Sequence, residues 1–146
     1  MKTIAALLLM LALPFAAQAS TCELEIDSND RMRFSKEELQ VPAGCDRVHL
    51  TLTHSGNLPR NAMGHNWVLA ETDKVQALAA DAIGAGVDNH YVPQKDARVL
   101  AATPLIGGGE ETSIEFSVAD LRGKDLTYFC SFPGHSMMMR GKLIVN

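Results

Sequence analysis

The chain has 146 residues, with 17 acidic side chains against 13 Lys and Arg and a formal net charge of −4 at pH 7. This acidic balance argues against a nucleic-acid-binding protein. The length suits one domain with its own hydrophobic core, which does not need a metal ion to collapse.

Residues 1–19 have the three parts of a secretory signal peptide. Lys2 supplies a short positive region, residues 4–15 form an apolar run, and Ala17-Gln18-Ala19 is a small-x-small cleavage site. The run is too short to span a bilayer, and no later segment reaches about 18 apolar residues. We expect export without a membrane span, with a retained amphipathic anchor as the alternative. Without Lys2, 12 basic side chains remain against 17 acidic ones, a formal charge of −5.

Most of residues 20–146 alternate apolar and polar side chains, which predicts half-buried strands of an antiparallel sheet. The predicted strands lie near residues 23–27, 31–34, 48–53, 65–70, 98–102, 113–118, 125–131 and 140–145. Turn residues such as Pro42-Ala43-Gly44 separate them. Residues 73–86 instead carry apolar side chains at helical spacing, with Thr72 or Asp73 able to cap the start. Many short strands with one inserted α-helix indicate an all-β fold, a two-sheet Greek-key β-sandwich.

Three cysteines in an exported chain leave one unpaired. An oxidising compartment favours a disulfide, whereas a thiolate favours a metal. We therefore expect Cys22 to pair with Cys45, and Cys130 to stay free beside His135. A different pairing, or an intermolecular disulfide through Cys130, stays open at this level.

Residues 130–139 hold a thiolate, an imidazole and a thioether, at Cys130, His135 and Met139. A second imidazole, His65, lies upstream in Met-Gly-His-Asn-Trp-Val. Two His and one Cys with a weak Met suit a copper ion that shuttles one electron, whereas structural zinc prefers four strong ligands. Each residue alone has an ordinary structural explanation, since Met fills core gaps. Spacing and strand parity select Met139 over Met138 as the weak ligand.

These motifs resemble those of the azurins, bacterial blue-copper proteins of the cupredoxin family. Met-Gly-His-Asn-Trp-Val, Asn-Leu-Pro at 57–59, Leu-Ile-Gly at 105–107 and Phe-Cys-x-Phe-Pro-Gly-His-Ser occur in azurin order. The resemblance implies a cupredoxin domain over residues 20–146 and one copper ion cycling between Cu(I) and Cu(II). It also implies the metal ligands His65, Cys130 and His135, weak axial contacts from Met139 and the Gly64 carbonyl, and a disulfide between Cys22 and Cys45.

The resemblance further implies supporting groups around the metal. Asn66 ties its strand to the Cys130 loop, and the backbone amides of Asn66 and Phe132 donate toward the sulfur; a purely loop-bracing Asn66 is the alternative. His54 is a core histidine near the copper, and Trp67 lies deep in the core. An apolar docking patch surrounds His135, with a merely well-packed loop end as the alternative. The docking patch comprises Leu58, Met63, Ile83, Phe132, Pro133, Met137 and Met138.

We therefore expect a periplasmic electron carrier and not an enzyme. Its partners would be transient redox proteins such as c-type cytochromes or periplasmic reductases. Copper storage or delivery is the alternative, although a chaperone needs exposed, exchangeable ligands. A copper enzyme is disfavoured because the chain offers one mononuclear ligand set and no open position for a substrate.

Overall fold

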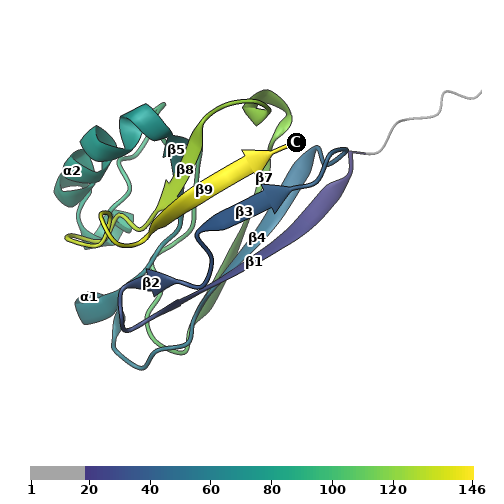
Figure 1. Cartoon of the computed structure of the whole chain (residues 1–146). Helices are drawn as coiled ribbons and strands as arrows, with labels where there is room; N and C mark the ends of the chain where they lie inside the picture. Colours follow the sequence, from purple (N-terminus) through teal and green to yellow (C-terminus); the bar gives the residue numbers. More distant parts are fainter. Residues whose placement is uncertain (1–18) are drawn as a thin grey trace, which may run out of the picture.

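Two β-sheets, one of four strands and one of five, face each other across a shared core in the computed structural model (Figure 1). The structure describes residues 19–146. The predicted signal peptide therefore lies outside the described residues, apart from Ala19. The predicted two-sheet sandwich is confirmed. Within the described range, no helix is long and apolar enough to cross a membrane.

The four-stranded sheet has the order β2-β1-β4-β7. Its strands are β1 (Thr21–Asn29), β2 (Arg33–Phe34), β4 (Arg47–His54) and β7 (Glu111–Ser117). On β4, buried Val48, Leu50 and Leu52 alternate with partly exposed neighbours, as the period-two pattern predicts. This sheet presents one face to the core and the other to solvent.

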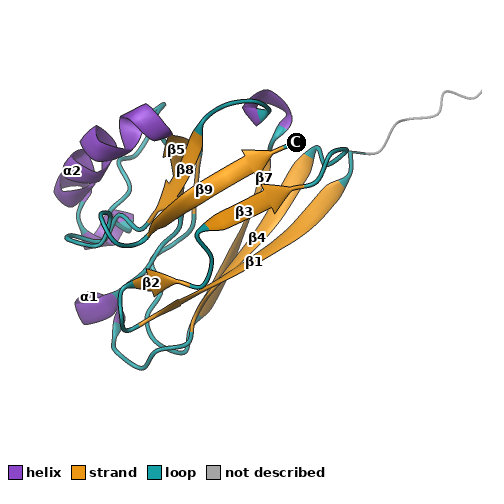
Figure 2. Cartoon of the chain, in the orientation of Figure 1, coloured by secondary structure: helices purple, strands orange, loops and turns teal. Residues whose placement is uncertain are grey.

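The five-stranded sheet has the order β3-β9-β8-β5-β6. Its strands are β3 (Glu38–Val41), β5 (Val68–Glu71), β6 (Ala101–Ala102), β8 (Leu126–Phe129) and β9 (Arg140–Val145). All four residues of β8 are buried. Helix α2 (Val75–Ala85) covers part of the outer face (Figure 2). There Val75 and Leu78 cluster with Val68 and Phe129. The prediction of half-buried strands is therefore wrong for β8, which is buried on both faces.

The predicted helix over residues 73–86 is confirmed, although its first turn is the 3₁₀ helix η1 (Thr72–Lys74). The predicted antiparallel pairing holds for most strand pairs, but β1 pairs with β4, and β3 with β9, in parallel. Strand β3 and the short helix α1 (Arg60–Met63) were not predicted. Each has only four residues, too few to show a period. Two further short 3₁₀ helices are η2 (Val87–Asn89) and η3 (Ala119–Leu121).

The predicted strands at 31–34, 65–70, 98–102 and 125–131 are all shorter in the structure. Met32 has φ of 54°, so the chain turns before β2 begins. His65 lies outside β5, in an isolated bridge with Ile106, and Cys130 follows the end of β8. Because residues 64–70 are all buried, strand parity cannot orient the His65 side chain.

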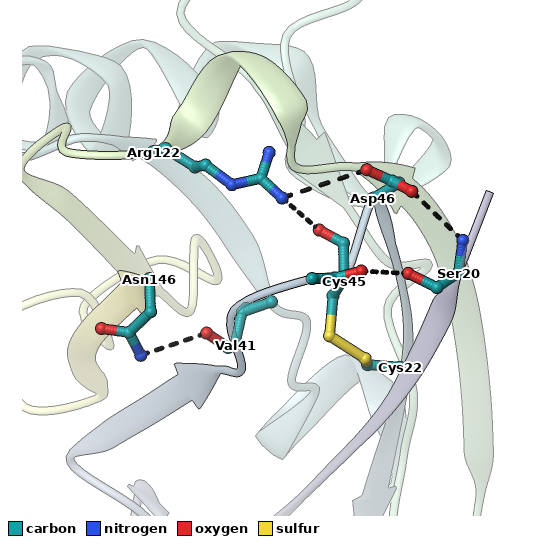
Figure 3. Close-up of a disulfide and its surroundings, with 8 residues drawn as sticks. Ser20, Cys22, Val41, Cys45, Asp46, Arg122 and Asn146 are labelled. Atoms are coloured by element: carbon teal, nitrogen blue, oxygen red, sulfur yellow. Dashed lines mark hydrogen bonds and ion pairs between the residues drawn. A yellow bond between two sulfur atoms is a disulfide. The ribbon is translucent and has the colours of Figure 1, made fainter. Parts of the chain in front are cut away.

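The predicted disulfide between Cys22 and Cys45 is confirmed, and it joins β1 to the loop before β4 (Figure 3). Cys130 is free and buried. The Arg122 guanidinium donates to the Cys45 carbonyl at 2.6 Å, and the Asn146 amide donates to the Val41 carbonyl at 3.2 Å. These bonds anchor the end of the sandwich that lies away from α1 and β2 (Figure 1).

Candidate metal centre

Three buried side chains, His65, Cys130 and His135, direct donor atoms at one another. Their ligand atoms all lie within 4.8 Å. The Cys130 Sγ atom is 3.8 Å from His65 Nδ1 and 3.7 Å from His135 Nδ1. Two imidazole nitrogens and one sulfur therefore converge on a single point, although 65 residues separate His65 from Cys130.

Backbone hydrogen bonds place each of these side chains. His65 and Ile106 exchange both backbone bonds at 2.9 Å, which attaches the His65 segment to the loop after β6. The Cys130 N–H donates to the Met139 carbonyl at 2.9 Å and closes the loop between β8 and β9. Gly134 turns this loop with φ of 84°, a conformation that glycine adopts without strain. The sulfur and the His135 ring are thus fixed at the same end of the sandwich.

The His65 ring presents a lone pair to the site. Its Nε2 lies 2.9 Å from the carbonyl oxygen of Asn29, and a carbonyl can only accept, so Nε2 carries the proton and Nδ1 is free. Burial lowers the pKa of His65 to about 4 and also lowers the pKa of His135. Both imidazoles are therefore neutral at pH 7, the form that ligates a metal.

The surroundings of the Cys130 sulfur suit a metal-bound thiolate. Burial raises its pKa to about 12, although the backbone N–H groups of Asn66 and Phe132 point at the sulfur and lower the pKa in part. An unpaired thiolate at this depth is unfavourable, and a bound cation would compensate by displacing the proton. One soft thiolate and two imidazoles form a donor set suited to copper.

Gly64 and Met139 border the cluster. The Gly64 carbonyl oxygen is 3.9 Å from the Cys130 sulfur. A Cβ atom at Gly64 would lie 2.3 Å from the Arg60 carbonyl and 2.9 Å from the Leu105 side chain, so only glycine fits there. Met139 is fully buried, and its N–H donates to the His135 carbonyl at 2.8 Å.

Comparison with known proteins supplies the wider context. A family model described as copper binding proteins, plastocyanin/azurin family, matches residues 20–146. The chain belongs to this family. It is 47% identical to azurin of Bordetella pertussis over 136 residues, covering 92% of this chain and 91% of that protein. It is 40% identical to azurin of Pseudomonas aeruginosa over 144 residues, covering 98% and 97%.

A solved structure of an azurin, Az-iso2 from Methylomonas sp. strain J, matches the fold with a TM-score of 0.82. It is 45% identical and covers 86% of this chain and 98% of its own. Together with the buried His–Cys–His cluster, these relatives identify a blue-copper electron-transfer protein, which is not an enzyme. The expectations of copper, of one-electron transfer and of redox partners in general are confirmed.

Asn66 clamps the two halves of this azurin-type site together. Its Nδ2 donates to the Ser131 hydroxyl and to the His90 carbonyl, both at 2.8 Å, and its Oδ1 accepts the Ser131 N–H at 2.9 Å. The Ser131 hydroxyl donates to the Tyr91 carbonyl at 2.7 Å. Sequence reasoning missed the 90–91 segment, in which both residues have positive φ, because no side-chain pattern marks it.

His54 lies beside the site but is not placed to ligate. Its ring stacks on the His65 ring with centroids 4.5 Å apart. Its Nε2 lies 2.9 Å from the Met63 carbonyl, and its Nδ1 accepts the Gly56 N–H at 3.0 Å. With one nitrogen donating and the other accepting, a neutral His54 has no lone pair left for a metal.

Four residues of the docking patch, Phe132, Pro133, Met137 and Met138, lie on the loop between β8 and β9. The other three come from α2 (Ile83), from α1 (Met63) and from the segment before α1 (Leu58). Met137 is 72% exposed, Met138 and Ile83 are each 57% exposed, and Leu58 is 42% exposed, while Met63, Phe132 and Pro133 are half-buried. A groove of about 470 Å³ separates α2 from the loop, with Ile83, Phe132, Pro133 and Met137 in its lining. His135 is only 4% exposed, and its ring centroid is 4.5 Å from that of Phe132.

Proposed function

We propose that this protein carries single electrons in the periplasm between redox proteins such as c-type cytochromes and periplasmic reductases. One copper ion would be held by His65, Cys130 and His135, with weak axial contacts from Met139 and the Gly64 carbonyl. The convergence of three buried donor atoms within 4.8 Å carries this ligand assignment. Bound copper supplies the one-electron Cu(II)/Cu(I) couple.

The protein frame holds the ligands in one arrangement. His65 is fixed at its backbone by Ile106 and at its ring by the Asn29 carbonyl. Asn66 and Met139 fix the segment that carries Cys130. Because these attachments come from different parts of the fold, the ligands rearrange little when one electron is gained or lost. Small rearrangement favours fast electron exchange.

Two backbone amides adjust the redox potential. The N–H groups of Asn66 and Phe132 are directed at the Cys130 sulfur, where they stabilise negative charge on the thiolate. A stabilised thiolate gives less electron density to the oxidised metal, which raises the reduction potential. Burial of Cys130 and His65 excludes water from the same atoms.

The apolar residues around His135 would form the contact surface for partners. Exposed apolar patches often mark interaction sites, and transient redox complexes bury little area. The His135 ring lies on the loop between the buried sulfur and this patch. Electrons would therefore enter and leave through His135, at the docking patch.

Storage or delivery of copper fits the site less well. Cys130 and His65 are fully buried, so exchange of the metal with another protein requires the loop between β8 and β9 to open. A protein that retains copper against a competing chelator and gives reversible voltammetry is a carrier. Ready loss of copper to the chelator would favour delivery instead.

The visible spectrum of the copper-loaded, oxidised protein tests the ligand assignment. A Cys–Cu(II) bond gives an intense blue colour, which Cys130→Ser should abolish and Met138→Leu, the matched control at an exposed neighbour, should retain. A colourless cupric protein, or a blue Cys130→Ser variant, would refute the proposal. Export is tested separately, since mature protein should begin at Ser20 and one that begins at Met1 would refute cleavage.

A further inference from the structure

Three arginines border the docking patch, and each approaches it from a different element. Arg31 lies on the turn between β1 and β2, next to Asp30. The Asp30 carboxylate accepts the N–H of Asn57 at 2.8 Å and that of Leu58 at 3.3 Å. This turn is therefore bonded directly to the segment that presents Leu58, a member of the patch.

Arg60 and Arg140 border the patch on its other sides. Arg60 is the first residue of α1, between Leu58 and Met63 in the chain. Arg140 begins β9 and lines the groove that also contains Phe132 and Met137. Helix α1, the turn before β2 and the loop before β9 lie at the same end of the molecule (Figure 1).

These three guanidinium groups are free to meet a partner. Arg31, Arg60 and Arg140 are exposed, and within residues 19–146 their side chains form neither an ion pair nor a hydrogen bond. Arg33, on β2, is also exposed and unpaired within this range, whereas Arg47, Arg98 and Arg122 each contact a carboxylate. Free arginines that surround an apolar surface favour bidentate pairing with carboxylates on another molecule.

Carboxylates at this end are held against the protein itself. Asp30 is bound to backbone amides as described, which lowers its pKa, and Glu110 accepts the Gly107 N–H at 2.6 Å. Asp88, on η2, is the exception, because its exposed carboxylate accepts no hydrogen bond within residues 19–146. The approaching partner therefore meets protruding arginine side chains, while two of the three nearby acids are turned to the backbone.

The protein's excess negative charge lies elsewhere. On the solvent face of the four-stranded sheet, Glu23 is in register with His49, and His49 with Glu115. Four residues further along β1, Asp27 is in register with Thr53, and Thr53 with Glu111. This acidic face repels an anionic partner, whereas the arginines attract it to the patch.

We propose that the docking patch receives an acidic partner, a redox protein whose apolar contact area is bordered by carboxylates that pair with Arg31, Arg60 and Arg140. This inference rests on the proposed electron-carrier function. It also predicts a salt dependence of the reaction rate opposite to the one that the net charge predicts. A chain of net charge −4 should repel anions, and added salt would then speed their reaction by screening the repulsion. If the local arginines attract the anion instead, added salt screens that attraction and slows the reaction.

The first test measures oxidation of the Cu(I) protein by hexacyanoferrate(III), in which one electron leaves the protein and hexacyanoferrate(II) forms. We expect the second-order rate to fall as ionic strength rises. For three charges about 10 Å from the anion, Coulomb attraction screened at 0.1 M is worth on the order of tenfold in rate. The triple variant Arg31→Gln, Arg60→Gln, Arg140→Gln should lose this factor with an unchanged visible spectrum.

Each arginine is also replaced singly by Gln, and the matched control is Lys36→Gln. It removes the same unit charge at a distance from the patch, where Lys36 contacts the Glu25 carbonyl at 2.7 Å. Its rate should stay within about twofold of the parent. A cationic cobalt(III) phenanthroline complex should show the reverse salt dependence. A parent rate with hexacyanoferrate(III) that rises with salt, or equal losses in the Lys36 and arginine variants, would overturn the proposal.

The second test uses redox-inert hexacyanocobaltate(III) and follows backbone amide NMR signals, so it does not depend on electron transfer. Shifts should concentrate at Arg31, Arg60 and Arg140, and scattered shifts or shifts centred on Lys36 would contradict the proposal. The third test compares c-type cytochromes of negative and positive net charge at equal driving force. The negative one should react faster, and a faster positive one would overturn the inference while leaving the carrier function intact.

Discussion

The variant Asn66→Ala tests whether the hydrogen bonds of Asn66 support the metal site or whether its side chain only fills space. The Asn66 amide makes three hydrogen bonds of 2.8–2.9 Å, to Ser131 twice and to the His90 carbonyl. Asn66 is fully buried, so the substitution leaves the Ser131 N–H without its partner. The segment that carries Cys130 then loses its side-chain link to the His65 segment.

The expected loss of stability follows from these bonds. At about 1 kcal/mol net for each buried hydrogen bond, the substitution should lower the free energy of unfolding by about 3 kcal/mol. For a domain of this size that corresponds to a fall in Tm of roughly 10 °C. The reduction potential should also fall, because the amides of Asn66 and Phe132 lose their fixed aim at the sulfur.

Thermal unfolding and protein-film voltammetry of the copper-loaded protein measure both effects. Ser131→Ala is the matched control, since it removes the hydroxyl but keeps the hydrogen bond that the Ser131 N–H donates to Asn66 Oδ1. It should destabilise less and leave the potential unchanged. An Asn66→Ala variant with the parent's Tm and potential would refute the clamp.

Three further predictions concern the core, the disulfide and pH. Trp67 is fully buried between Phe116 and Tyr128, and its Nε1 has no hydrogen-bond partner within the described residues. The tryptophan fluorescence emission should therefore be strongly blue-shifted. Emission at the wavelength of indole in water would contradict this. Replacing Cys22 and Cys45 together by Ala opens a loop with a sequence separation of 23. The free energy of unfolding, measured by urea titration, should fall by about 3 kcal/mol. An unchanged urea midpoint would disprove this prediction. In the metal-free protein, the folded pKa of His65 near 4 lies below its unfolded value of 6.5, so the folded state binds fewer protons. Stability should therefore fall as pH drops from about 6.5 to 4, by up to about 3 kcal/mol, and His65→Gln should flatten this dependence. A parent without that slope would show that His65 charges freely in the fold.

Local sequence was enough to predict one half of the metal site. Cys130, His135 and Met139 lie within ten residues, and the loop that joins β8 to β9 brings them together by a few backbone bonds. The strand pattern on β4 and β7 was also predictable, because only one face of that sheet is buried. Period two reports burial on one face, and these strands satisfy that condition.

Other features depend on contacts that no local pattern encodes. The His65 tautomer is set by the Asn29 carbonyl, 36 residues away, and the Asn66 clamp closes on a loop in which His90 and Tyr91 have positive φ. Strands buried on both faces, such as β8, lose the alternation. The parallel pairing of β1 with β4 likewise follows from assembly of the whole sheet.

The amino-acid sequence by itself determined the chemistry available to this protein: three cysteines, of which one is left over after pairing, two imidazoles and a thioether, in a chain of alternating strands. Only the tertiary structure decided which nitrogen of each ring faces the sulfur, and which arginines surround the docking patch. The physical reason is that donor type belongs to a residue. The direction of a lone pair, the burial of a side chain and the charges near it are set by the segments that pack against the residue.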